Sequence, residues 1–82
     1  MPNDADNHQT IRKTVHTAVD SYLRTMDDQE VTNLYEMVLA EVEASLLAGV
    51  MQHTGNNQSK TATLLGLSRG TLRTKLRKYR LL

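Results

Sequence analysis

The chain has 82 residues and no cysteine, which excludes disulfide bonds and cysteine-based zinc sites. Its hydrophobic fraction is 39% and its three aromatic residues are all tyrosines, so one copy has few large side chains for a core and we expect an oligomer. All nine acidic residues lie in residues 1–46, which carry a net charge of −6, whereas residues 47–82 carry seven basic residues and no acid, a net charge of +7 that indicates a surface for a polyanion.

The first predicted helix spans residues 11–26. Residues 1–9 hold no large apolar residue after Met1 and are predicted to be a disordered N-terminal tail. From Ile11 to Met26 apolar residues recur at helical spacing, and Thr10 is a candidate N-cap. No apolar run approaches the roughly 18–20 residues that span a bilayer, and the acidic N-terminus is unlike a targeting peptide, so we expect a cytoplasmic protein with no membrane partner.

A second, longer helix is predicted to end near Thr54. Two adjacent apolar stripes run along it. The first consists of Leu34, Val38, Val42, Leu46 and Val50, and the second of Tyr35, Leu39, Leu47 and Met51. A helix that is apolar over so much of its surface is buried on several sides. We therefore predict that the first stripe mediates dimerisation and that residues 10–54 form two dimerisation helices.

Two short helices are predicted at the basic end, over residues 58–65 and 69–80, after a break at Gly55. Asn57 and Ser68 are their candidate N-caps, and Gly66 lies in the turn between them. This arrangement is typical of a helix–turn–helix, so residues 57–80 are predicted to be a DNA-binding unit. No segment alternates at the period of a strand. The expected fold is all-α, with four helices.

The last predicted helix carries four arginines on its exposed side, at i, i+4, i+8 and i+11 from Arg69. Basic side chains on a helix in the major groove neutralise phosphates, and arginine pairs bidentately with guanine. The three histidines are not spaced as metal ligands, and the chain has no grouping that supports catalysis. We therefore expect a binding protein that is not an enzyme and uses no metal and no cofactor.

The sequence NQSKTATLLGLSRGTLRTKL at residues 57–76 resembles the C-terminal helix–turn–helix of the Fis family, a motif that bacterial enhancer-binding activators share. The sequence LYEMVLAEVE at residues 34–43 resembles the long dimerisation helix of the Fis family itself, so that the resemblance covers residues 10–80. It implies an interlaced homodimer in the nucleoid, whose two helix–turn–helix units bind degenerate AT-rich DNA, bend it and regulate transcription globally.

The resemblance also implies which residues contact DNA, with Arg69 as the candidate for a base contact to guanine. Thr74 stands where the family has a basic residue and is included because it lies beside the arginines. The expected set is Asn57, Ser59, Arg69, Thr71, Arg73, Thr74, Lys75, Arg77 and Lys78. The family's β-hairpin arm, which touches a DNA invertase, lies ahead of the first helix. About ten residues precede that helix here, so we expect neither the hairpin nor the invertase contact.

Two alternative functions are compatible with this pattern. The first is the helix–turn–helix module of an enhancer-binding activator, and the second is a basic helical module that binds an acidic partner protein. Duplex binding that weakens steeply with salt distinguishes a DNA-binding protein from the second alternative.

Overall fold

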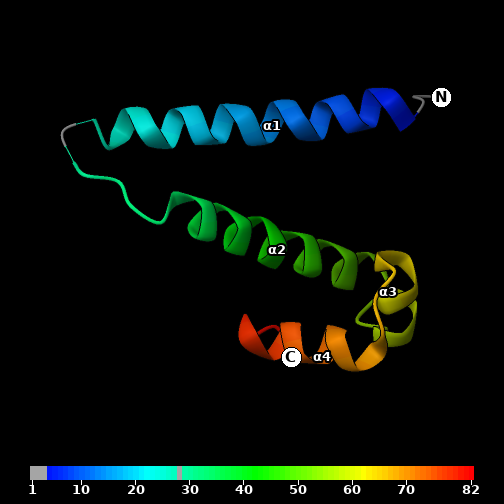
Figure 1. The fold of residues 1–82 in the computed structure, drawn as a ribbon. Coiled ribbons are helices and arrows are strands. Elements are labelled where there is room, and N and C mark those ends of the chain that lie inside the picture. Colours follow the sequence, from blue (N-terminus) through cyan, green and yellow to red (C-terminus); the bar gives the residue numbers. More distant parts are fainter. Residues whose placement is uncertain (1–3, 28) are drawn as a thin grey trace. The chain divides into compact units, whose positions relative to one another are not determined.

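The computed structural model describes residues 4–27 and 29–82, and within them the chain is all-α, as predicted (Figure 1). The four helices are α1 (Asp4–Thr25), α2 (Leu34–His53), α3 (Gln58–Leu65) and α4 (Arg69–Lys78). None of these described helices combines the length and the hydropathy that crossing a bilayer requires. The chain divides into two compact units, residues 1–34 and residues 35–82.

Helix α1 begins seven residues before the position that the sequence predicted. Residues 4–9, which we expected to be disordered, form its first turns, while residues 1–3 of the expected tail lie outside the described residues. Thr10 is therefore not an N-cap, because it lies within the helix and its hydroxyl donates a hydrogen bond to the Asp6 carbonyl at 3.0 Å. The stretch contains no glycine or proline, so it supports a helix although it has no apolar face to bury.

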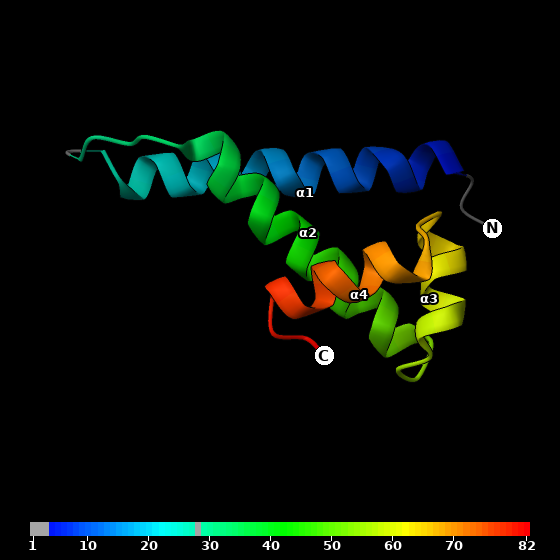
Figure 2. The ribbon, with the colours of Figure 1, turned by 60° about the horizontal axis from the view of Figure 1, so that its bottom comes forward.

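The second unit is held together by a small apolar core. Leu47 and Met51 of α2 contact Ala62 of α3 and Leu72 and Leu76 of α4, and all five side chains are buried. Leu65 and Tyr79 pack against this core from its edge. From Tyr35 onward, helix α2 thus belongs to the same compact unit as the helix–turn–helix (Figure 2), whereas the sequence had grouped it with the first helix in residues 10–54.

A hydrogen-bonded pair of threonines joins the end of α2 to α3. Thr61 is fully buried, and its hydroxyl lies 2.7 Å from the hydroxyl of Thr54. The Thr54 oxygen also accepts a hydrogen bond from the backbone N–H of Asn57 at 3.2 Å. Gly55, at φ +64°, ends α2 between these residues, so the sharp turn is fixed both by backbone conformation and by side chains.

The apolar stripes of α2 are divided differently from the prediction. The second predicted stripe splits, because Leu47 and Met51 enter the core while Tyr35 and Leu39 remain exposed. Val42 and Leu46 of the first stripe are also exposed, at 41% and 51% of their surface. Residues 35, 39, 42 and 46 are spaced by four, three and four positions, which places them on one face of the helix. We call this exposed surface the α2 apolar face.

Candidate nucleic-acid interface

The N-terminus of α3 is fixed by Asn57, as the sequence predicted. Its side-chain oxygen accepts a hydrogen bond from the backbone N–H of Lys60 at 3.0 Å. This satisfies one of the backbone donors that a helix start leaves free. Asn57 and Ser59, two of the expected DNA contacts, are exposed at this helix start, where backbone N–H groups favour an anion such as a phosphate.

The turn between α3 and α4 depends on the backbone conformation of one glycine. Gly66 adopts φ +72°, which an L side chain rarely tolerates. Its N–H donates to the Thr63 carbonyl and the N–H of Leu67 donates to the Ala62 carbonyl, at 3.2 and 3.0 Å. These two bonds satisfy the last carbonyls of α3 and turn the chain toward the start of α4.

Ser68 begins α4, again as predicted. Its hydroxyl oxygen accepts a hydrogen bond from the backbone N–H of Thr71 at 3.2 Å and donates one to the Thr71 hydroxyl at 2.9 Å. Thr71 is thus held at the exposed first turn of α4, two positions after Arg69. A polar first turn beside an arginine is the part of a recognition helix that reaches base edges and phosphates.

Helix α4 separates an apolar side from a basic side. Leu72 and Leu76 are fully buried against α2 and α3. Of the nine residues that the sequence proposed as DNA contacts, seven are exposed: Asn57, Ser59, Arg69, Thr71, Thr74, Arg77 and Lys78. Within the part of the chain that the structure describes, the side chains of Arg69 and Arg77 have no hydrogen-bond or ion-pair partner. Their charges are therefore available to a polyanion.

Arg73 and Lys75 are the two exceptions, because each is half-buried and bound to another part of the protein. Arg73 Nη1 donates a hydrogen bond to Gln58 Oε1 of α3 at 3.0 Å. Lys75 Nζ forms an ion pair with Glu43 Oε2 of α2 at 3.0 Å. Gln58 and Glu43 were not predicted from the sequence, since they lie 15 and 32 positions away and no local pattern connects them with α4.

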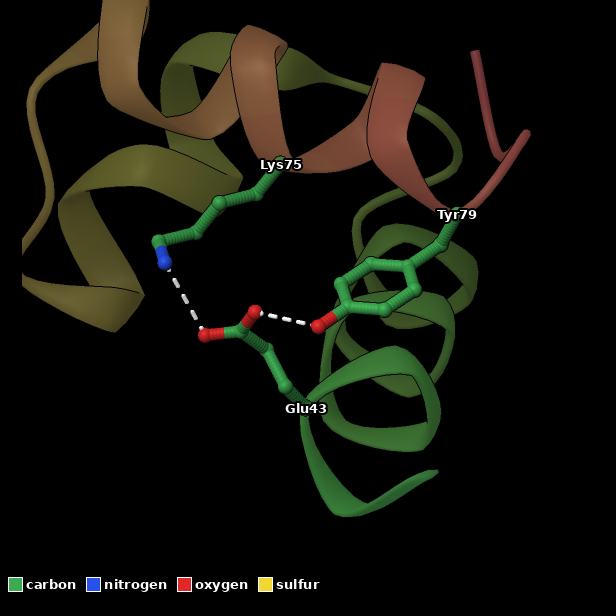
Figure 3. Close-up of polar contacts among 3 residues, drawn as sticks. All are labelled: Glu43, Lys75 and Tyr79. Atoms are coloured by element: carbon green, nitrogen blue, oxygen red, sulfur yellow. Dashed lines mark hydrogen bonds and ion pairs between the residues drawn. The ribbon is translucent and has the colours of Figure 1, made fainter. Parts of the chain in front are cut away.

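Glu43 also accepts a hydrogen bond from the hydroxyl of Tyr79, at 2.6 Å from Tyr79 to Oε1 (Figure 3). This hydrogen bond, and then the one from Lys75, hold the pKa of Glu43 below its usual value of 4.5. The same contact raises the pKa of Tyr79 above its usual value of 10.0, since the negative carboxylate favours the neutral phenol. The ammonium of Lys78 lies 5.3 Å from the centre of the Tyr79 ring, within the range of a cation–π contact.

Comparison with known proteins is consistent with this geometry. The family described as "Bacterial regulatory protein, Fis family" matches residues 38–79, which include most of α2 and all of α3 and α4. The DNA-binding protein Fis of Glaesserella parasuis serovar 5 is 55% identical over 69 residues, which are 84% of this chain and 70% of that protein.

The DNA-binding proteins Fis of Vibrio cholerae serotype O1 and Vibrio vulnificus are each 49% identical over 76 residues. These residues make up 93% of this chain and 78% of each relative, so the similarity extends beyond the helix–turn–helix. The relatives are named for binding DNA and not for an enzymatic reaction. The chain therefore belongs to the Fis family of bacterial regulatory proteins.

Proposed function

We propose that this protein is a DNA-binding transcriptional regulator of the bacterial nucleoid, in which α4 enters the major groove. The observation that carries the proposal is the exposed basic side of α4, with Arg69 and Arg77 unpaired among the described residues. The opposite side of the helix is fixed in the core by Leu72 and Leu76. The relatives named as DNA-binding proteins support the same function.

Specificity is proposed to depend mainly on DNA shape. Arg69 and Thr71 are the exposed polar side chains of the first turn of α4, so few groups are available to bind base edges. Arg77 and Lys78, near the other end of the helix, supply charge for phosphates. A protein with few base contacts selects DNA sequences whose duplex bends, or whose minor groove narrows, at low energetic cost. This favours AT-rich sites and a bent complex.

The active species is proposed to be a homodimer. Its interface includes the predicted stripe of Leu34, Val38, Val42, Leu46 and Val50 together with the remainder of the α2 apolar face, where Tyr35 is 77% exposed. Helix α1 has no buried side chain among its described residues, although apolar residues recur along it. Most of the stability of a protein helix comes from tertiary packing of its apolar side. A second copy of the chain would provide that packing for both helices.

A contact with a DNA invertase is not part of the proposal. The contact that the resemblance to the Fis family implies depends on a β-hairpin arm ahead of the first dimerisation helix. Residues 4–25 form a single helix here, so this stretch does not supply a hairpin. A recombination assay with an invertase and its enhancer would test this directly, and inversion supported by the chain would contradict it.

Titration of duplex DNA at several salt concentrations tests the proposed function. We expect tight binding to an AT-rich duplex with flanking G and C. The logarithm of the association constant should fall linearly with the logarithm of the salt concentration. Arg69→Ala should cost roughly 1–3 kcal/mol on the preferred site and reduce discrimination at the guanine position. Lys78→Ala should weaken binding to all sequences alike and reduce the salt slope by about 0.9 per subunit.

Two results would contradict the proposal. Absence of duplex binding by the wild-type protein would favour the alternative of a basic module that binds an acidic protein. Equal losses from Arg69→Ala on every sequence would remove its role as the residue that reads guanine, and Arg73 would then be the next candidate for that role.

A further inference from the structure

One polar cluster outside the exposed basic side links α2 to α4. Figure 3 shows the carboxylate of Glu43 between the ends of the Lys75 and Tyr79 side chains. Lys75 Nζ lies 3.0 Å from Oε2, and the Tyr79 hydroxyl lies 2.6 Å from Oε1. Both carboxylate oxygens of one α2 residue are therefore bound, one by α4 and one by its C-cap residue. We call these three residues the α2–α4 clamp.

The spacing of the clamp fixes the orientation of α4 as well as its distance from α2. Lys75 and Tyr79 are four positions apart, which is about one helical turn, so they contact Glu43 from successive turns. Two contacts separated along an axis resist rotation and tilting of that axis, whereas a single contact permits both. The buried residue Leu76 lies between them in sequence and holds the same side of the helix in the core.

The ion pair also changes the part that Lys75 plays at the surface. The side chains of Lys75 and Glu43 are 34% and 32% exposed, and they neutralise each other. Arg77 and Lys78, in contrast, are exposed and form no ion pair with the described residues. A lysine that is already paired contributes little to the counterion release that drives phosphate binding.

We propose that Glu43 is a positioning residue that orients the recognition helix α4 for its DNA site, and that Lys75 serves this clamp and not a DNA phosphate. The inference rests on the proposed DNA-binding function and revises one of the nine contacts expected from the sequence. A recognition helix must be held to within about 0.5 Å and 10–20° for its side chains to reach base edges. Loss of the clamp therefore reduces sequence discrimination while the phosphate contacts persist.

The first experiment compares two variants that each remove one negative charge from α2. Glu43→Gln removes the ion pair of the clamp and the charged acceptor of the Tyr79 hydroxyl, whereas Glu41→Gln changes an exposed carboxylate two positions away that makes no hydrogen bond with α4. For each dimeric protein, affinity is measured on the preferred duplex and on a scrambled duplex of equal length. Glu43→Gln should lower the ratio of the two affinities by about fivefold or more, the lower end for loss of one base contact. Glu41→Gln should keep the wild-type ratio.

The second experiment isolates the part played by Lys75. The double variant Glu43→Gln with Lys75→Met has the wild-type net charge and leaves neither charge of the ion pair without its partner. Its salt slope should equal that of the wild type, whereas Arg77→Met should reduce the slope by about 0.9 per subunit. A reduction of that size in the double variant would show that Lys75 neutralises a phosphate and would overturn its assignment to the clamp.

A third variant keeps the inference testable if Glu43→Gln does not fold. Tyr79→Phe removes one hydrogen bond and changes no charge, and circular dichroism reports whether each variant retains its helices. A folded Tyr79→Phe protein is expected to discriminate less than the wild type. If a folded clamp variant discriminated between the two duplexes as well as the wild type does, the role of the clamp would be overturned but the proposed DNA-binding function would stand. If the wild-type protein bound no duplex, the proposed function itself would be overturned.

Discussion

Thr61 is a polar side chain that is fully buried where α2, α3 and the turn between them meet. Replacing Thr61 with valine keeps almost the same side-chain volume but removes its hydrogen bond with Thr54. The part-buried hydroxyl of Thr54 then has one partner fewer. We therefore expect Thr61→Val to lower the free energy of unfolding by about 1–2 kcal/mol. Chemical denaturation monitored by circular dichroism measures the change.

Thr63→Val is the matched control for this change. Thr63 lies on the same helix, but it is exposed and its hydroxyl donates to the Ser59 carbonyl in contact with solvent. Its replacement should alter the free energy of unfolding by less than about 0.5 kcal/mol. Equal effects at both positions would mean that the buried threonine pair does not stabilise the corner.

Glu43 and Tyr79 give the protein a defined dependence on pH. Because the folded pKa of Glu43 is lowered, its contribution to stability is present above the unfolded value near 4.5 and is lost as pH falls through the folded pKa. Because the folded pKa of Tyr79 is raised, its contribution is present below 10.0 and is lost as pH rises through the folded pKa.

Thermal melting between about pH 3 and pH 7 tests the acid limb of this dependence. The melting temperature of the wild type should fall more steeply with acidification than that of Glu43→Gln, which has no carboxylate to protonate at this position. Parallel curves for the two proteins would show that the contacts of Glu43 do not stabilise the folded state.

At the scale of single elements, the C-terminal end of α4 carries a local conformational cost. Arg80 has φ +58°, and the N–H of the following Leu81 donates to the Leu76 carbonyl at 2.8 Å, which is the pattern in which glycine is usual. Arg80→Gly should raise the free energy of unfolding by about 0.5–1 kcal/mol, because relief of the left-handed strain exceeds the added entropy of the unfolded chain. Chemical denaturation measures the gain, and Arg80→Ala, which keeps the strain and removes the same charge, should show none.

The helix boundaries show where sequence patterns succeed at this scale. Helix α3 begins and ends at the predicted residues, since Asn57 and Gly66 are residue types with specific capping chemistry. Helix α1 begins at Asp4 and not near Thr10, because hydrophobic periodicity detects only the part of a helix that carries an apolar side. A polar extension of a helix leaves no such signal.

At the scale of the whole molecule, the α2 apolar face provides a test of assembly. We expect the wild type to sediment at about twice the 9.2 kDa mass of one chain. Leu46→Glu places a charge at the proposed interface and should shift the protein to monomers that have lost helical structure, since an unpaired buried charge is costly. Analytical ultracentrifugation with circular dichroism measures both effects.

Gln52→Glu controls for the added charge in that experiment. Gln52 is exposed on the same helix but lies off the α2 apolar face, so its variant should remain dimeric. A Leu46→Glu protein that stayed dimeric and folded would place the interface between copies elsewhere on the chain.

The helix–turn–helix and its basic side could be predicted from the sequence. Helical periodicity, two capping residues and one turn glycine predicted the helix–turn–helix, and the charge separation predicted its basic side. These properties are local, because each depends on residues within a few positions of one another. The exposed positions of Arg69 and Thr71 followed from the same periodicity.

How α2 is used, and which basic side chains remain free, depends on the way the helices pack. The periodicity of α2 gave a broad apolar surface but could not divide it, since the division depends on where α3 and α4 pack. Pairing of Lys75 with Glu43, 32 positions earlier, left no pattern in the sequence for the same reason. Contacts between residues distant in sequence arise when the chain closes on its core, so their partners are known only once the helices are placed together.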